Sequence, residues 1–401
     1  MGIYEELGIR PIINASGSVT RLGGAPLPAA VLEAFCQAAA EAAPLDQMQA
    51  AACRRIAAVT GAEAGIVTAG AAAALTLGAA AILTGSDVRR MEQLPHVDGA
   101  FADEFVVARE QRNGYDHAVR AAGARLVEVG FNEIVANAGV RRTEVWEYEA
   151  AFGPRTAGVL YVYAPDSRPE LAALAAAAHA RGLPVLVDAA GELPPRANLR
   201  EIIARGADLV AFSGGKAIRG PQASGMLCGR RDLVAAAALQ MLDMDDHFEL
   251  WEPPPELIDK SKLPGMPRHG IGRGFKVAKE QIAALLKALE LFAAGEYEAD
   301  RDLQRRHVQT IATALEGCAA TAALVDHGAD GPPPLLEIAV NAVRLGRSAL
   351  EVCRRLRHGS PPCYVGHGKL SEGKLVINPL HLNDVRTTAL AARLREELRC
   401  I

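Results

Sequence analysis

Short runs of β-branched and other apolar residues alternate with alanine-rich stretches between about residues 60 and 230. This alternation is typical of a parallel sheet whose strands are joined by helices. We therefore predict an α/β fold built on a mainly parallel, seven-stranded sheet. The predicted strands are 63–67, 104–108, 125–129, 158–163, 184–188, 208–212 and 225–229, with helices between them that include 70–82 and 169–182.

The rest of the chain predicts a second, smaller lobe. A proline-rich segment, 247–276, interrupts the alternation and is predicted to form a long irregular connection, of the kind that often carries functional residues. One or two long helices are expected over 279–317. The remaining predicted elements, which suit a small α+β lobe, are strands at 334–340 and 374–378 and helices at 347–357 and 383–398.

The length supports the same division, because 401 residues exceed what one hydrophobic core usually organises. We expect an N-terminal arm with helices over residues 1–60. A large domain is expected over 61–290 and a small α+β C-terminal domain over 291–401. The alanine-rich helix at 70–82 is expected to pack closely against the sheet of the large domain.

Composition narrows the class of protein. The net charge of −4 gives no reason to expect nucleic acid or an anionic membrane as a partner, so a small-molecule substrate is favoured. Seven cysteines without a CxxC pair favour reduced thiols over a disulfide framework or a zinc site, and no metal is expected. The N-terminal sequence has no signal-peptide pattern, and no apolar run is long enough to span a membrane. These features predict a cytoplasmic location.

Lys216 is the residue that most needs an explanation. It lies in AFSGGKAIRGPQASG (211–225), among glycines directly after a predicted strand. A lysine there could bind a nucleotide phosphate, carry a covalent cofactor, or be a solvent-exposed turn residue without a specific role. The nucleotide-loop motif fails, because Val210 stands where its first glycine should be and Ala217 stands where its Ser or Thr should be. HGIGRG (269–274) fails as a dinucleotide motif because it follows no strand.

A covalent-cofactor role for the lysine requires two further groups. Pyridoxal phosphate needs a carboxylate that keeps its ring nitrogen protonated, and its phosphate needs the N–H groups of a helix start. Asp188 ends a predicted strand, and Gly70, Ala71 and Ala72 open a predicted helix directly after another. Like Lys216, they lie at the carboxyl ends of strands, where ligands bind in open α/β sheets. Together the three features predict a pyridoxal phosphate site.

The same motifs resemble those of a known family. FSGGKAIRGPQASGMLCG, GARLVEVG, VDAAGELPP and RPIINASGSVTRLGG resemble the fold-type I pyridoxal phosphate enzymes, in the branch that contains selenocysteine synthase and the D-glucosaminate phosphate ammonia-lyases. The SGGK form is closer to the ammonia-lyases. The resemblance implies an aspartate aminotransferase-like fold, a cofactor-binding large domain, pyridoxal 5'-phosphate as cofactor, and an active site at the interface of a homodimer or higher homo-oligomer.

The resemblance also implies roles for individual residues. Lys216 would form the Schiff base with the cofactor and later remove the Cα proton, and Asp188 would pair with the ring nitrogen. The start of the helix at Gly70, Ala71 and Ala72 would bind the phosphate, with Ser213 as an additional donor. Relatives often carry a histidine that stacks on the ring where this chain has Gln111, and His117 is a second candidate for stacking. The cations expected to bind the substrate's acid group are Arg21, Arg112, Arg268 and Arg273, with His269 and Lys276 as further candidates. In the small lobe, Lys369 or His367 could reach the substrate.

We therefore expect a pyridoxal phosphate-dependent lyase. Its reaction would be α,β-elimination of a hydroxy-amino acid or an amino-sugar acid, which releases a 2-keto acid and ammonia. Other reactions on the same fold stay open, namely β-replacement, racemisation, aldol cleavage and transamination. A non-catalytic binding or regulatory relative is the alternative from another class, and the presence of both Lys216 and Asp188 argues against it.

Overall fold

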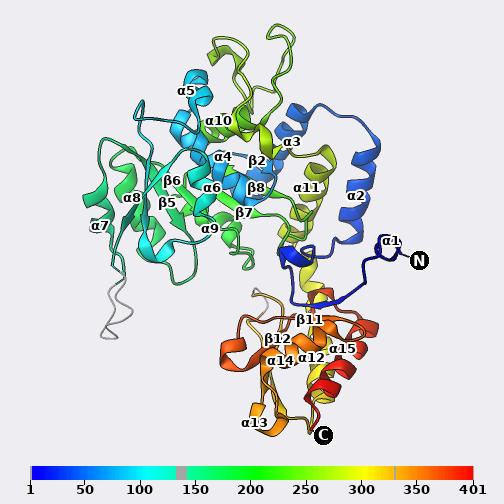
Figure 1. Ribbon diagram of the computed structural model, residues 1–401. Helices are drawn as coiled ribbons and strands as arrows, with labels where there is room; N and C mark the ends of the chain where they lie inside the picture. Colours follow the sequence, from blue (N-terminus) through cyan, green and yellow to red (C-terminus); the bar gives the residue numbers. More distant parts are fainter. Residues whose placement is uncertain (1, 132–141, 329–330, 401) are drawn as a thin grey trace. The chain divides into compact units, whose positions relative to one another are not determined.

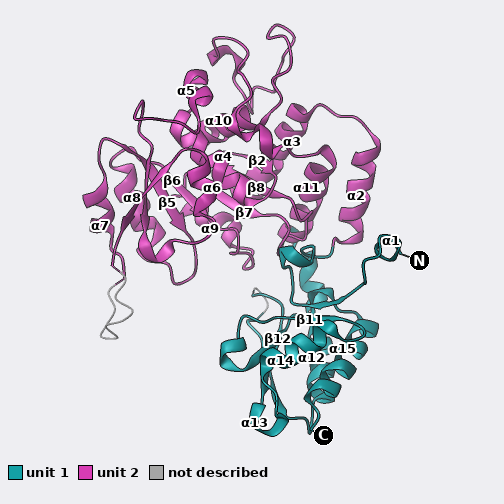
Figure 2. Ribbon diagram, viewed as in Figure 1, with its two compact units in different colours: residues 1–26, 294–401 teal, residues 27–293 magenta. Residues whose placement is uncertain are grey.

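The computed structural model describes residues 2–131, 142–328 and 331–400, and it divides into two compact units (Figure 2). Unit 1 comprises Met1–Pro26 with Ala294–Ile401, and unit 2 comprises Leu27–Ala293. The first residues group with the C-terminal part because β1 (Ile13–Ala15) pairs in parallel with β11 (Cys363–Val365). The division therefore differs from the three parts expected from the sequence, in which residues 1–60 stand alone.

Unit 2 contains, within the described residues, a seven-stranded sheet in the order β2-β8-β7-β6-β5-β3-β4 (Figure 1). Neighbouring strands are parallel, except that β8 is antiparallel to both β2 and β7. The strands are β2 (Ala64–Thr68), β3 (Glu104–Ala108), β4 (Arg125–Val129), β5 (Thr156–Val162), β6 (Val185–Asp188), β7 (Leu209–Ser213) and β8 (Gly225–Gly229). Each predicted strand overlaps one of them, so the predicted mainly parallel α/β fold is confirmed.

The helices of this region cover both faces of the sheet. They are α2 (Ala29–Ala40), α3 (Leu45–Thr60), α4 (Ala71–Thr84), α5 (Val88–Gln93), α6 (Asp116–Ala121), α7 (Val145–Ala151), α8 (Leu171–His179), α9 (Asn198–Ala204), α10 (Arg231–Met241) and α11 (Lys279–Ala294). Helices α4 and α10 pack against each other, and Figure 1 shows them as neighbours.

Two close approaches fix α4 and α3 on opposite faces. A Cβ added to Gly78 of α4 would lie 2.8 Å from a methyl of Leu186 and 3.4 Å from one of Leu227. A Cβ added to Gly65 of β2 would lie 2.4 Å from Ile56 of α3 and 3.2 Å from the Cβ of Cys228. Successive strand residues such as Leu227 and Cys228 point to opposite faces, so the two helices sandwich the sheet. The expected close packing of the alanine-rich helix is confirmed.

Six of the seven strands end at the same edge of the sheet, and β8 begins there. In the register, Gly225 at the start of β8 pairs with Thr68 at the end of β2 and with Ser213 at the end of β7. The residues that follow the strand ends are therefore gathered along one edge. Ligands bind at this carboxyl edge in open α/β sheets.

Unit 1 is the small α+β lobe expected from the sequence. Its main sheet is antiparallel, in the order β12-β10-β9, and its core is one apolar cluster that includes Ile338 and Leu356. Its elements are α1 (Ile3–Glu6), α12 (Asp300–Ala314), β9 (Ala320–Val325), β10 (Leu335–Val340), α13 (Ala342–Leu345), α14 (Ala349–His358), β12 (Lys374–Ile377) and α15 (Asp384–Leu398). Strand β9 was not predicted, because its ATAALV sequence is rich in alanine, which favours helices.

The long helical stretch expected over 279–317 is two helices, α11 and α12, with Gly295 in the left-handed conformation between them (φ 80°). The irregular connection expected over 247–276 contains only short 3-10 turns, of which the longest is η5 (Ile271–Phe275). Among the residues that the structure describes, no helix is both long and apolar enough to cross a membrane.

Candidate active site

Lys216 lies in a tight turn that follows β7. The N–H of Gly214 donates a hydrogen bond to the carbonyl of Ser224 at 2.9 Å, which ties the two sides of the turn together. A Cβ added to Gly215 would lie 2.9 Å from the Cα of Gln222, so the turn has room only for glycine at this position. Lys216 is half-buried, so it belongs to a well-packed turn and not to a free surface loop.

Asp188 is the last residue of β6 and is only 8% exposed. Burial raises the pKa of its carboxyl, and the hydrogen bond from the N–H of Ala190 (3.0 Å) and the charge of Lys216 oppose this only in part. A Cβ added to Gly191 would lie 4.0 Å from the Nζ of Lys216, so the amine reaches the loop that follows Asp188. The structure therefore brings the predicted acid and lysine to the same part of the sheet edge.

The N-terminus of α4 lies at this edge as well. Gly70 is its N-cap with a φ of 102°, and the N–H groups of Ala71 and Ala72 are among those that a helix leaves unpaired. A Cβ added to Gly225 would lie only 2.5 Å from the carbonyl carbon of Gly70 and 2.7 Å from the nitrogen of Ala71. Glycine at the start of β8 therefore lets the helix start approach the sheet, and Ser213 is the register neighbour of Gly225. Such a helix start binds phosphate readily.

These groups fit pyridoxal phosphate by their chemistry. Because residue 225 has no side chain, the start of α4 lies close against the sheet edge, and its N–H groups suit a phosphate. The buried carboxyl of Asp188 suits a cationic ring nitrogen, which would offset the burial that raises its pKa. The primary amine that the cofactor requires is supplied by Lys216.

Gln111 is buried, and both ends of its side-chain amide are occupied. Its Oε1 accepts the N–H of Val162 at the end of β5 (2.9 Å), and its Nε2 donates to the carbonyl of Arg168 (3.1 Å). His117 is exposed on α6, with its Nδ1 3.3 Å from the guanidinium of Arg120. The stacking role predicted for Gln111 or His117 stays a prediction.

Two carboxylates near Asp188 were not singled out from the sequence. Asp116 is 5% exposed and pairs with Arg112, one of the predicted substrate-binding cations, and its charge contributes to the raised pKa of Asp188. Glu192, half-buried in the loop after β6, has a pKa raised by burial and by the charge of Asp188, and Lys216 acts in the opposite direction. The sequence signal for Glu192 was its place four residues after Asp188, whereas Asp116 resembles any acid at a helix start.

The other predicted substrate-binding cations occupy different surroundings. Arg268 is 82% exposed at its side chain and pairs with Glu92 at 2.6 Å. Arg273, in η5, pairs with Asp243. Arg21 belongs to unit 1, in the 3-10 turn η1 (Thr20–Leu22). The structure thus brings only Arg112 of this set into the charged network around Asp188.

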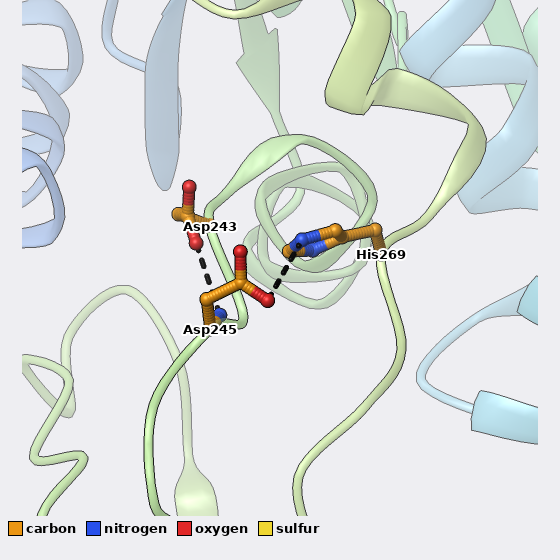
Figure 3. A group of neighbouring side chains, drawn as sticks. All are labelled: Asp243, Asp245 and His269. Atoms are coloured by element: carbon orange, nitrogen blue, oxygen red, sulfur yellow. Dashed lines mark hydrogen bonds and ion pairs between the residues drawn. The ribbon is translucent and has the colours of Figure 1, made fainter.

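A group of potential metal ligands lies outside this site. Asp243, Asp245 and His269 have ligand atoms within 4.8 Å of one another and are exposed (Figure 3). Each of the three side chains has a partner within the protein. Asp243 accepts the N–H of Asp245 (2.9 Å) and pairs with Arg273, and Asp245 pairs with His269 (3.3 Å). The pattern is that of a surface ion-pair network, and we assign no metal to it.

Comparison with a solved structure identifies the class of protein. The structure of D-glucosaminate-6-phosphate ammonia-lyase matches this one with a TM-score of 0.80 and 28% sequence identity, over 99% of this chain and 98% of that chain. Together with the lysine, the buried acid and the helix N-terminus, this match defines a fold-type I enzyme that depends on pyridoxal phosphate.

The chain belongs to the SelA family, described as L-seryl-tRNA selenium transferase, whose family model matches residues 12–244. It is 28% identical to the D-glucosaminate-6-phosphate ammonia lyase of Salmonella typhimurium, over 98% of this chain and 97% of that protein. It is 32% identical to the 5'-C-glycyluridine monooxygenase-decarboxylase of a Streptomyces species, over 98% of this chain and 92% of that protein. The predicted family, fold class and cofactor are confirmed.

Proposed function

We propose that the protein catalyses an α,β-elimination on a hydroxy-amino acid or an amino-sugar acid and releases a 2-keto acid and ammonia. One observation carries this proposal. Lys216, the buried carboxyl of Asp188 and the start of α4 lie at the same edge of the sheet. The similarity to an ammonia lyase over nearly the whole chain supports the same reaction class.

Each residue has a defined task in this reaction. Lys216 would hold the cofactor through its Nζ, and once the substrate is bound the same Nζ would accept the proton from Cα. The carboxylate of Asp188 would pair with the ring nitrogen of the cofactor and keep it protonated. When bound, pyridoxal phosphate supplies an electron sink for the electron pair that the departing proton leaves on Cα. The helix N-terminus at Gly70 and the hydroxyl of Ser213 would hold its phosphate.

Loss of the β-hydroxyl needs a proton at the leaving oxygen. Glu192 is suited to donate it, because its raised pKa keeps a larger share of its carboxyl protonated than that of an exposed glutamate. The protonated Nζ of Lys216 is a second donor in the same loop region. Among the predicted substrate-binding cations, Arg112 pairs with Asp116, whose charge acts on Asp188.

We also propose a small-molecule substrate, no nucleic-acid partner, and a homodimer or higher homo-oligomer as the working form. The net charge of −4 supports the absence of a nucleic-acid partner. The predicted cytoplasmic location is retained as part of the proposal.

The test uses the purified protein loaded with pyridoxal phosphate. The lysine-bound cofactor gives a visible absorbance band, which should be lost in Lys216→Ala and kept in Lys262→Ala, a control at an exposed lysine. Ammonia and keto-acid release is then measured with D- and L-hydroxyamino acids and with amino-sugar acids, phosphorylated and unphosphorylated.

The outcomes separate the proposal from its rivals. Stoichiometric ammonia and keto acid from one of these substrates supports elimination. Oxygen uptake with release of carbon dioxide would favour the reaction named for the Streptomyces relative, and amino transfer to an added keto acid would favour transamination. A loaded protein that yields no product from any of them contradicts the proposal.

A further inference from the structure

A second group of basic side chains lies in unit 1, around the ring of Tyr364 in β11. The guanidinium carbon of Arg357 lies 5.2 Å from the ring centroid, and that of Arg21 lies 5.9 Å from it. The Nδ1 of His367 lies 3.5 Å from a guanidinium nitrogen of Arg357 and 3.4 Å from one of Arg21. Three basic side chains therefore converge at one tyrosine.

The fold of unit 1 assembles this basic cluster from distant parts of the sequence. Arg21 and His367 are 346 positions apart. The parallel pairing of β1 with β11 sets Asn14 opposite Tyr364, and η1 with Arg21 follows shortly after β1. Between them Gly17 has a φ of 85°, and a Cβ there would lie 2.7 Å from the side chain of Asn378. The close turn therefore fixes the path of the chain toward Arg21.

The two arginines of the basic cluster have no acidic partner. Among residues 2–131, 142–328 and 331–400, no carboxylate forms an ion pair with Arg21 or Arg357. In addition, the Nε of Arg357 is buried and has no hydrogen-bond partner in that part of the chain. The two guanidinium groups, both within 3.5 Å of the same imidazole nitrogen, therefore carry positive charge that no carboxylate of the described residues balances, and an anion would balance it.

The imidazole completes the set of donors. Guanidinium groups only donate, so the Nδ1 of His367 accepts from them and the proton of the neutral ring is on Nε2. The Nε2–H of His367 then adds a donor beside the two guanidinium groups. The cluster combines two permanent positive charges with an additional neutral donor.

We propose that Arg21, Arg357 and His367 bind the dianion of a phosphate monoester. Two guanidinium charges balance a dianion, whereas a carboxylate would leave one of them uncompensated. The planar fork of arginine matches the oxygens of a phosphate, and its stacking on Tyr364 holds it in place. The dianion has two possible sources: the distal phosphate of the substrate, which rests on the proposed function, or a phosphate-bearing effector.

Calorimetric titration of the holoenzyme with inorganic phosphate tests the site directly. The holoenzyme is used so that the cofactor's own phosphate fills the α4 N-terminus. We expect binding to weaken about tenfold or more in Arg357→Met and in Arg21→Met, because each removes hydrogen bonds to a charged group. Arg354→Met is the matched control, an exposed arginine on the same helix, and should bind phosphate as the unaltered protein does.

Folding is controlled separately. Arg21 is exposed, so Arg21→Met should keep the melting temperature, and Arg357→Lys should recover part of the phosphate affinity that Arg357→Met loses. An unaltered holoenzyme that binds no phosphate overturns the proposal, as does an equal loss of affinity in Arg354→Met. This titration needs no turnover, so its result does not depend on whether the proposed elimination occurs.

Steady-state kinetics distinguishes the two sources. If the substrate's phosphate occupies the site, Arg357→Met raises KM for a phosphorylated amino-sugar acid and leaves KM for its unphosphorylated counterpart unchanged. If an effector occupies it, added phosphate alters the rates with both substrates, and Arg357→Met abolishes that response. Phosphate binding that affects neither reaction would mark an adventitious ion only and would overturn the proposal.

Discussion

Carboxylates at the large sheet edge and on the small lobe respond to their surroundings in opposite directions. Burial raises the pKa values of Asp188 and Glu192 beside Lys216. On unit 1, hydrogen bonds from Lys369 and Lys374 (3.1 Å for Lys374) lower the pKa of Glu337. The carboxylates at the sheet edge are therefore incompletely compensated, whereas Glu337 has its cations in place.

The difference distinguishes a carboxylate that stabilises the folded state when charged from carboxylates that destabilise it when charged. A carboxylate with fixed cationic partners favours the folded state in its charged form, whereas a buried one with a raised pKa opposes folding when charged. Such uncompensated groups are typical of functional sites. The arginines of unit 1 divide in the same way, since Arg301 and Arg305 both pair with Asp326, whereas Arg21 and Arg357 have no carboxylate partner within the described residues.

The largest effect is expected at the lysine of the uncompensated region. Lys216→Ala removes the group that we propose attaches the cofactor and accepts the Cα proton, so kcat/KM should fall by about a thousandfold or more. The visible band of the lysine-bound cofactor should disappear with it. Activity and absorbance spectra check this, with Lys262→Ala as the control. Retention of either signal would show that another amine carries the cofactor.

Asp188→Asn should lower activity and raise stability. Without a carboxylate at the ring nitrogen, kcat should fall by about a hundredfold or more. In the apo-protein the folded pKa of Asp188 lies above the unfolded value, so the folded state binds the proton more tightly between the two. Stability therefore falls as pH rises through that window, and the uncharged asparagine avoids the loss. Near neutral pH the variant apo-protein should melt at a higher temperature.

Thermal melts of the unaltered apo-protein and of apo Asp188→Asn, from acidic to neutral pH, show whether the substitution raises or lowers the melting temperature. The hydrogen bond from Ala190 remains possible with asparagine, so the comparison isolates the charge. The melting temperatures should converge at the acid end, where the aspartate is protonated in both states. An apo Asp188→Asn that is less stable at neutral pH would contradict the account of an uncompensated carboxylate.

Gly225→Ala tests the phosphate end of the site. The added methyl would lie 2.5 Å from the carbonyl carbon of Gly70, and overpacking of this kind costs about 1–3 kcal/mol. The start of α4 must shift, so the dissociation constant of pyridoxal phosphate should rise by about tenfold. Cofactor titration by absorbance measures it. Gly153→Ala is the control, since nothing lies within 4 Å of a Cβ there, and equal affinity in the two variants would rule out the proposed phosphate contact.

The sequence predicted the seven strands and the three central site features because each depends on local pattern. Lys216 and the helix start at Gly70 follow strands, Asp188 ends one, and parallel strands bring their carboxyl ends to one edge. Stacking and substrate-binding roles could not be derived from such patterns. Gln111, for example, has an amide held by backbone groups 51 and 57 positions away.

What the sequence did not reveal depends on burial and on distant pairing. The raised pKa of Glu192 arises from tertiary packing, which no local motif encodes. β1 and β11 are three residues each, too short for a periodic signal, and their pairing joins the two ends of the chain. The pairing of β1 with β11 brings Arg21 to the same tyrosine ring as Arg357. The sequence therefore predicted Arg21 as a substrate ligand but could not show that it lies beside Tyr364 and Arg357.

The smallest effect is expected at Glu337, the carboxylate with cationic partners. Its substitution should lower the melting temperature at neutral pH, whereas Asp188→Asn should raise it. Glu337 has a lowered pKa in the folded state, so it stabilises the protein above its unfolded pKa, and this contribution is lost as pH falls through the folded pKa. Glu337→Gln should therefore melt slightly lower at neutral pH, with kcat/KM unchanged, and the difference should vanish in acid. Because exposed ion pairs contribute little, the shift should also shrink at high salt. A higher melting temperature for Glu337→Gln would remove the distinction between the two regions, since both carboxylates would then oppose folding.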